Sequence, residues 1–290
     1  MFRTVEATIK KQAREILAKN NWVKSIVGTL MVMSIVSIGI LIFNGATLLL
    51  SEDILSDIVG LALNVFLSIV ALVIFLFLSP LYTGYVRFVD KCKTRETGDI
   101  NDFFYYFIDK ATYMNTVHLN LLLALFYALM FIVCFAPAIV MLVLSKTDMG
   151  NQVVFQIVAV WLAIFGVIAF FIGSRFISMT TYLYVADVNY RKETDLIKAS
   201  VYIVKRNISR VINLFISYLP WVVPCFFVLP LVFVYPYFKH SVVLSYSYIY
   251  DMENNNPSSQ YFNSNIPLNP QPMNVGQYPT DKNDKFNGIY

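Results

Sequence analysis

The chain has 290 residues and a net charge of +4, with 58% hydrophobic and 14% charged residues. A soluble domain is usually about half apolar and about a quarter charged. The excess here lies in uninterrupted blocks, which excludes an ordinary soluble domain and predicts an all-α, polytopic transmembrane helical bundle. The three cysteines form no C-x-x-C pair and the bases form no nucleic-acid module, so we expect no metal site, disulfide framework or nucleic-acid partner.

Residues 1–24 have the period of an amphipathic helix. The apolar face carries Val5, Ile9, Ala13, Ile16 and Leu17, whereas the bases Lys10, Lys11 and Arg14 lie off that face. We therefore expect a helix outside the membrane before the first span, with residues 25–250 forming the transmembrane domain.

Five apolar blocks follow. The first four cover about residues 25–50, 58–86, 117–144 and 153–177, and each exceeds the ~20 residues that cross the hydrocarbon layer. The fifth, residues 211–250, is about twice that length and contains Pro220, Pro224, Pro230 and Pro236. We interpret it as a tight hairpin of two kinked spans, which gives about six spans. A single span followed by an interfacial segment is the alternative.

The distribution of Lys and Arg predicts the orientation. Bases are frequent before the first span and in the loops 87–114 and 187–210, whereas SEDILSD has none and SKTDMGNQ has only Lys146. The N-terminus and both long loops are therefore expected on the cytoplasmic side. Residues 251–290 are rich in Asn, Pro and Gln with few aliphatic residues, which is typical of a disordered tail.

Both long loops also contain helical patterns. Ile100, Phe103, Phe104, Phe107 and Ile108 have the spacing of one helix face, and Asp99 is a plausible N-cap. In the second loop, Leu196, Ala199 and Ile203 form a stripe. Such helices either lie in the headgroup region with the apolar face inward or pack on the cytoplasmic ends of the spans, and both alternatives remain open.

Two of these segments align at one constant offset. Ala13, Leu17, Lys19, Asn21, Lys24 and Ile26 match Ala199, Ile203, Lys205, Asn207, Arg210 and Ile212. A true repeat would give three units, each an amphipathic helix that leads into a membrane hairpin, although a biased composition can produce such a match by chance.

The stretch LSPLYTGYVRF ends the second block. Pro80 permits a kink, Gly84 lets a neighbouring helix approach closely, and Arg87 can extend its charge to the headgroups. With AREILAKNNW and YVADVNYRKETDLIKASVYIVKRN, this stretch and the following FFYYF resemble the bacterial integral-membrane family known only as domain of unknown function 975. The resemblance covers roughly residues 10–250, but Pro137-Ala138 stands where the family commonly has Pro-Gly. The family has no established activity or ligand, so the resemblance implies a topology and no chemistry.

Few polar residues inside the apolar blocks suggest chemistry. His118 and His240 have no partner at metal-ligand or triad spacing, and no Walker A or G-x-S-x-G motif is present, so we expect no cofactor and no enzymatic activity.

Arg175 is the candidate intramembrane polar site, because a charge inside a span is functional by default. Near the inner end of its span it would instead snorkel to the headgroups, whereas a span extending to Ala186 would place it in mid-bilayer. Asn44, Asn64, Asn120 and Asn213 could line a polar path or form hydrogen bonds between helices.

These observations predict a non-enzymatic, multi-pass protein of a bacterial cytoplasmic membrane. We expect its cytoplasmic helices to contact anionic lipid headgroups, or a membrane or cytoplasmic protein partner, in membrane sensing, scaffolding or envelope homeostasis. The candidate contacts are Phe103, Phe104, Phe107, Lys10 and Arg14. The alternative is a small permease or lipid translocator in which proline-kinked spans provide alternating access.

Overall fold

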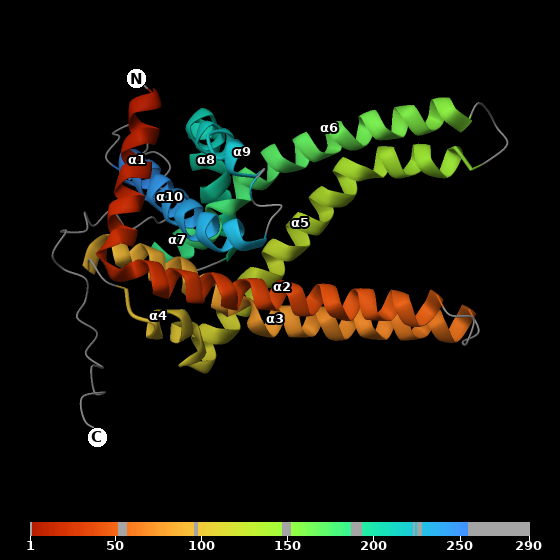
Figure 1. Ribbon diagram of the computed structural model, residues 1–290, viewed down its shortest axis with the longest axis horizontal. Helices are drawn as coiled ribbons and strands as arrows, with labels where there is room; N and C mark the ends of the chain where they lie inside the picture. Colours follow the sequence, from red (N-terminus) through yellow and green to blue (C-terminus); the bar gives the residue numbers. More distant parts are fainter. Residues whose placement is uncertain are drawn as a thin grey trace.

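The computed structural model describes residues 2–51, 57–95, 98–146, 152–186, 193–222, 224 and 228–254, and none of these residues lies in a strand. Two long hairpins dominate the shape (Figure 1). One pairs α2 (Trp22–Ser51) with α3 (Asp57–Arg95), and the other pairs α5 (Lys110–Leu144) with α6 (Gln152–Ser178). Both point away from the remaining helices, so each hairpin has one end in a compact part and one end far from it.

Three helices of the two hairpins have the length and surface of membrane helices. Within the described residues, the helices Val65–Lys93, Lys110–Leu144 and Gln152–Ala186 are long and apolar enough to cross a membrane. Large apolar side chains such as Phe66, Val133 and Phe165 are mostly exposed on their walls, which fits a lipid environment. The first predicted span is helical as α2, but most of its side chains after Ile35 lie outside the described residues. The count of about six spans therefore stays a prediction.

The fifth apolar block forms a turn between two helices. α8 (Glu193–Ile216) ends inside this block, and the short α9 (Leu219–Val222) and then α10 (Val228–Asn254) follow. Pro220 lies in the first turn of α9, where its missing N–H costs little, and Pro236 lies inside α10. α10 is not among the three helices that, within the described residues, are long and apolar enough to cross a membrane. The chain reverses here, but crossing of the membrane by its two arms stays a prediction.

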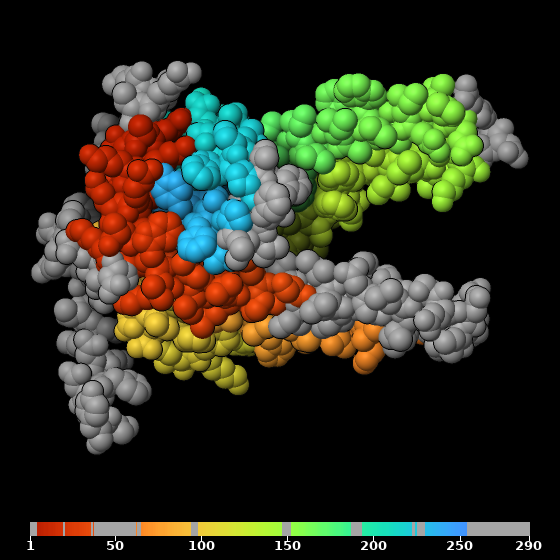
Figure 2. All heavy atoms as spheres, viewed as in Figure 1, coloured from red at the N-terminus to blue at the C-terminus, as the bar shows by residue number. Residues whose placement is uncertain are grey.

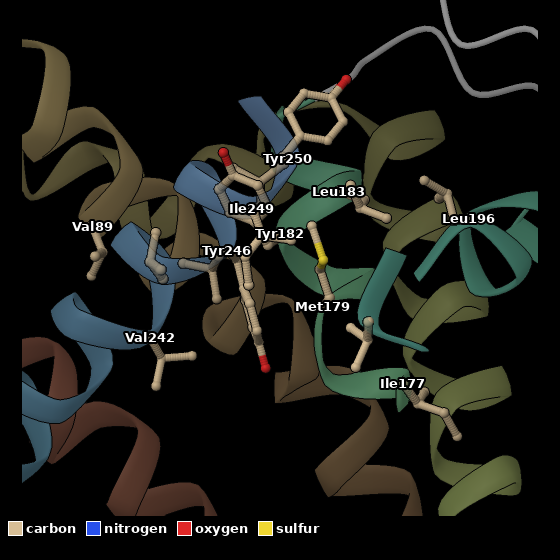
Figure 3. Packing of buried hydrophobic residues seen from close by; sticks show 14 of the residues in the cluster. Val89, Ile177, Met179, Tyr182, Leu183, Leu196, Val242, Tyr246, Ile249 and Tyr250 are labelled. Carbon is tan, nitrogen blue, oxygen red and sulfur yellow. The ribbon is translucent and has the colours of Figure 1, made fainter. Parts of the chain in front are cut away.

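The compact part, which we call the body, consists of α1 (Phe2–Ile16), the second half of α3, α4 (Asn101–Phe104), α7 (Thr180–Ala186), α8 and α10. α10 is its central helix, because it contacts α1, α2, α3, α7 and α8. Figure 3 shows Tyr246 and Ile249 of α10 beside Tyr182, Met179 and Leu183, and all five are buried. Continuous burial of this kind makes the body a packed core that fixes the base of both hairpins.

The amphipathic stripes of α1 and α8 pack on protein. Ile9 and Ala13 of α1 are buried against Leu244 of α10, and Leu196 and Ala199 of α8 are buried in the main core. Of the two alternatives that the sequence left open, these stripes therefore follow the second, in which the apolar face covers other helices. The cytoplasmic location of these helices stays a prediction.

Residues 100–108 do not form the single helix that their pattern predicts. α4 covers only Asn101–Phe104, and a 3₁₀ turn, η2 (Tyr105–Phe107), follows it. The N-cap of α4 is Ile100 rather than the predicted Asp99, although the Asp99 carboxylate accepts from the Asn101 backbone N–H at 3.3 Å. The change of helix type rotates the later side chains away from the α-helical face.

Asn21 and Asn207, which the internal alignment matches, both lie at irregular points in helices. A π-helical segment, η1 (Leu17–Asn21), joins α1 to α2, and α8 is bent at Asn207, where φ is −118° and ψ is 19°. The Asn21 amide donates to the Ile16 carbonyl at 2.9 Å, and the Asn207 amide donates to the Ile203 carbonyl at 3.2 Å. The two segments therefore share a device that redirects a helix.

Several predicted boundaries differ from the structure. α3 continues to Arg95 and α5 begins at Lys110, so much of the expected loop 87–114 is helical. α8 begins at Glu193 within the expected loop 187–210, and α10 ends at Asn254 rather than at residue 250. Residues 255–290, which were predicted to be disordered, lie outside the described residues.

Candidate functional site

The segment between α3 and α5 is attached to the body end of the first hairpin. Lys24 Nζ donates to the Gly98 carbonyl oxygen at 2.7 Å, and Asn21 Oδ1 accepts from the Gly98 backbone N–H at 3.2 Å. The Asp102 carboxylate lies 2.7 Å from Lys91 Nζ and 3.9 Å from Arg87 Nε. These partners come from the helices of the first hairpin, so the segment has a fixed position on that hairpin.

Phe103 is a core residue, which corrects its prediction as a lipid contact. It is 1% exposed, and its ring stacks on Phe88 and Tyr85 with centroid distances of 4.6 Å and 5.8 Å. A Cβ on Gly84 would overlap the Phe103 carbonyl oxygen, and a Cβ on Gly28 would overlap the Phe103 ring. Gly84 therefore does allow a close approach, but to the backbone of the connecting segment.

The neighbouring aromatic residues remain on the surface. Phe104 is 43% exposed and Phe107 is 38% exposed, and Ile108 is more exposed still. We call these three residues the apolar ridge. The ridge directly precedes the N-terminus of α5, where Asp109 accepts from the Thr112 backbone N–H at 3.1 Å. Hydrogen bonds from Thr112 lower the pKa of Asp109, so its carboxylate caps the helix in the charged form.

The two predicted basic contacts on α1 differ from each other. Lys10 Nζ donates to the Ser217 carbonyl oxygen at 3.2 Å and lies 4.5 Å from the centroid of the Tyr218 ring. Burial lowers the pKa of Lys10, although the charge of Glu6 opposes this shift. Arg14 is exposed. Lys10 therefore helps to attach α1 to the end of α8, and Arg14 is the one of the two that is open to a headgroup.

Arg175 lies where α6 enters the body. At 1.5 Å per residue it is about 35 Å along α6 from Gln152, and Tyr82 is about 37 Å along α3 from Asp57. The hydrocarbon layer is ~30 Å thick, so far ends placed at one boundary bring both residues near the other boundary. The apolar helix does continue to Ala186, but its final part, α7, is buried in the body. This geometry favours the interfacial position for Arg175 over mid-bilayer.

Several polar side chains converge at this level from α3, α5, α6 and α10. We call them the tyrosine–cation cluster: Tyr82, Tyr127, Arg175, Lys239 and Tyr246. Lys239 Nζ donates to the Tyr82 hydroxyl at 2.7 Å and lies 4.2 Å from the centroid of that ring. The charge of Arg175 acts on the hydroxyl groups of the three tyrosines, and the Tyr246 hydroxyl forms a hydrogen bond with Ser178 Oγ.

Arg175 is also held by apolar and weakly polar partners. Its guanidinium carbon lies 4.0 Å from the Phe215 ring centroid and 4.9 Å from that of Phe171. Its Nη2 donates to Ser174 Oγ at 3.0 Å. Stacking on two rings fixes the plane of the guanidinium without neutralising its charge.

Sequence reasoning singled out Arg175 and suggested Tyr82 only as a headgroup-level tyrosine, and it missed Lys239. A lysine inside the apolar block 211–250 was the available signal, because a charge in such a block requires an explanation. No sequence spacing connects Lys239 with Tyr82, since their contact depends on how α10 crosses α3.

The other polar candidates have local roles. Asn120 donates to Ser79 Oγ at 3.1 Å, which links α5 to α3 as an interhelical hydrogen bond, and His118 is exposed. His240 is buried, and its Nε2 lies 3.0 Å from Ser25 Oγ. The side chains of Asn44 and Asn64 lie outside the described residues. Within the part of the chain that the structure describes, no three His, Cys, Asp or Glu residues gather as a metal set.

A shallow pocket lies between α1, α8 and α10, away from these groups. Its lining includes Val5, Ile9, Arg210, Leu214 and Tyr248, and it has room for about one water molecule. Neither Arg175 nor the candidate asparagines line it.

Comparisons of the chain with protein-family models, with curated proteins and with solved structures found no match in any of the three.

Proposed function

We propose that this chain is a non-enzymatic, multi-pass protein of a bacterial cytoplasmic membrane, whose body lies on the cytoplasmic side and contacts anionic headgroups. Its role would be membrane sensing, scaffolding or envelope homeostasis. The positions of Lys and Arg support this orientation, and the three apolar helices support a membrane location. The resemblance to domain of unknown function 975 is part of the same proposal.

The apolar ridge is the observation that carries this proposal. Phe104, Phe107 and Ile108 remain exposed although Phe103 beside them is fully buried. They lie at the body end of α5, where aromatic residues commonly anchor a protein at the headgroup level. Exposed bases nearby in the chain, such as Lys110, can attract anionic lipid at the same level.

Amide hydrogen exchange tests the proposal directly. The full chain is reconstituted in nanodiscs of phosphatidylcholine, with or without phosphatidylglycerol, and exchange is followed in residues 101–109. We expect anionic lipid to slow exchange there, because the ridge is then covered by headgroups. Replacing Phe104 and Phe107 together by Ser should remove this difference. Val201→Ser, an exposed apolar position on α8, is the matched control and should keep it. Equal exchange of the native chain in both compositions would contradict the proposal.

A small permease or lipid translocator is the second candidate. The observation that favours it is the pair of cations, Lys239 and Arg175, at the level where the two hairpins meet the body. Pro80 and Pro137 lie inside α3 and α5, which are the helices that would have to bend. Proteoliposomes that contain fluorescently labelled lipid distinguish the two candidates when dithionite is added outside. Dithionite quenches the label in the outer leaflet, and only a translocator brings inner-leaflet lipid to that side and makes it accessible.

A further inference from the structure

Lys239 carries a buried charge without a carboxylate to balance it. Lys239 is only 8% exposed, and within the described part of the chain its one hydrogen bond is to the Tyr82 hydroxyl. It has no ion-pair partner among the described residues. Burying an ammonium group costs free energy that a phenol and its ring only partly return. The charge is therefore better explained by an anion that completes the site.

Arg175, on α6, is a second cation that an anion would balance. In the described chain it likewise has no carboxylate partner, and its polar contacts are with Ser174 Oγ and the Phe171 carbonyl oxygen. Its charge and that of Lys239 both act on Tyr82. Lys239 contacts the Tyr82 hydroxyl directly and the charge of Arg175 acts on the same group, so the two cations can serve a group with two or more negative oxygens.

The tyrosines add donors to this centre. The Tyr82 hydroxyl accepts from Lys239, so its own proton remains available for an acceptor. Tyr127 contributes a half-buried hydroxyl from α5 on which Arg175 also acts. No carboxylate is present in the described contacts of the two cations or of the two donor tyrosines, Tyr82 and Tyr127. This favours an anionic ligand over a cation.

The surroundings distinguish a lipid from a small anion. The α5–α6 hairpin and α3 diverge beyond the body (Figure 2), and their walls expose Ile69, Leu72, Leu129 and Phe165. Such walls suit acyl chains, whereas the cluster lies at the depth expected for the phosphate, as the helix lengths indicate. A phosphodiester with two tails matches both parts at once.

We propose that the tyrosine–cation cluster binds the phosphate of an anionic phospholipid, with Lys239 and Arg175 pairing with its oxygens and Tyr82 and Tyr127 donating hydrogen bonds. The acyl chains lie along α3 and α5. This inference rests on the proposed membrane location of the hairpins, but not on the contact between the apolar ridge and the bilayer. Free phosphate shares the same head chemistry and is distinguished by experiment.

Thermal unfolding of the full chain in a neutral detergent tests the site. Increasing amounts of phosphatidylglycerol, phosphatidylcholine or inorganic phosphate are added to the native chain and to the variants Lys239→Met and Arg175→Gln. We expect phosphatidylglycerol alone to raise the unfolding temperature of the native chain. In each variant the half-saturating concentration should rise about tenfold or more, because a charge-assisted hydrogen bond is lost.

The lipid-free measurement separates a binding role from a structural one. Without lipid, Lys239→Met should unfold at the same or a higher temperature, because an unbalanced buried charge has been removed. A structural Lys239 would instead lower the temperature and leave the lipid response unchanged, which would overturn the proposal. Lys198→Met, an exposed position on α8, is the control and should respond like the native chain.

The remaining outcomes are equally decisive. Equal stabilisation by phosphatidylcholine would overturn the preference for an anionic lipid, and equal stabilisation by inorganic phosphate would overturn the lipid as the ligand. The double variant of Phe104 and Phe107 should retain the response to phosphatidylglycerol. Failure of the ridge experiment and failure of this one are therefore distinguishable.

Discussion

Gly84 and Phe103 decide how the connecting segment meets the first hairpin. The backbone of Phe103 occupies the space that any side chain at position 84 would need, and its ring lies against Gly28 of α2. Phe103 is therefore buried, while Phe104 directly after it is exposed. Two adjacent phenylalanines that look equivalent in the sequence therefore have opposite environments, because only Phe103 packs into the space beside Gly84 and Gly28.

Gly84→Ala should destabilise the protein, by about 1–3 kcal/mol, because the new methyl group would overlap the Phe103 backbone and the segment would have to move. Unfolding temperature in detergent micelles measures the effect. Gly173→Ala is the matched control, since the atoms nearest to its methyl group belong to the flexible Met130 side chain. A native-like unfolding temperature for Gly84→Ala would show that the close approach is unimportant.

At the scale of single residues, the sequence predicted the need for a small residue at position 84 but not its partner. The period of residues 100–108 placed Phe103, Phe104 and Phe107 on one face, which assumes one continuous α-helix. The chain instead changes to a 3₁₀ turn after Phe104, and Asp109 then starts α5. Contacts with α2 and α3 decide this change, and periodicity contains no information about them.

At the scale of elements, two helices are redirected by an asparagine. Asn21 lies in the π-helical junction between α1 and α2, and Asn207 lies at the bend in α8. Each side-chain amide donates to a carbonyl oxygen of the preceding turn. Arg210 further holds Asn207 through a hydrogen bond of 2.7 Å to its Oδ1. The aligned positions thus share a physical role, which strengthens the hypothesis of a repeat.

Asn21→Ala and Asn207→Ala should each lower stability by about 1 kcal/mol or more, because a hydrogen bond that supports the bend is lost. Hydrogen exchange in the turn after each asparagine should also become faster. Asn213→Ala is a suitable control, since no side-chain hydrogen bond of Asn213 is present with the described residues. Equal behaviour of all three variants would remove the special role of the two bends.

At the scale of the whole molecule, two apolar hairpins extend from one side of a packed body (Figure 1). Lys146 lies at the far end of the second hairpin, and Lys198 lies on α8 in the body, so these exposed residues mark opposite ends of the molecule. The apolar walls between them are consistent with the bilayer occupying that interval.

Cysteine labelling should place the two ends on opposite sides of the membrane. In a chain whose own cysteines are replaced, Lys146→Cys is expected to react with an impermeant maleimide in intact cells. Lys198→Cys should react only after the membrane is permeabilised, because the proposed orientation puts the body inside. The reverse pattern would invert the topology, and labelling of both positions in intact cells would contradict a membrane between them.

The helical class and the long apolar helices were predictable because they depend on composition and block length. The tyrosine–cation cluster was not, since Tyr82 and Lys239 are brought together by the crossing of α3 and α10. The apolar stripe on α1 was found from its period, but its partner Leu244 on α10 could not be, because a stripe does not identify what covers it. The sequence pattern thus identified which helix faces are apolar, whereas tertiary packing determined which residues cover them.

The position of Phe103 has a consequence for biosynthesis. The ribosome adds this residue only after both α2 and α3 have been made, yet the ring and backbone of Phe103 fill the gaps left by Gly28 and Gly84. The two helices are therefore complete before the residue that fills the space between them is made, and their contact stays unfilled until the following segment docks. Because of this order of translation, the packing between α2 and α3 is completed only when the connecting segment docks on them.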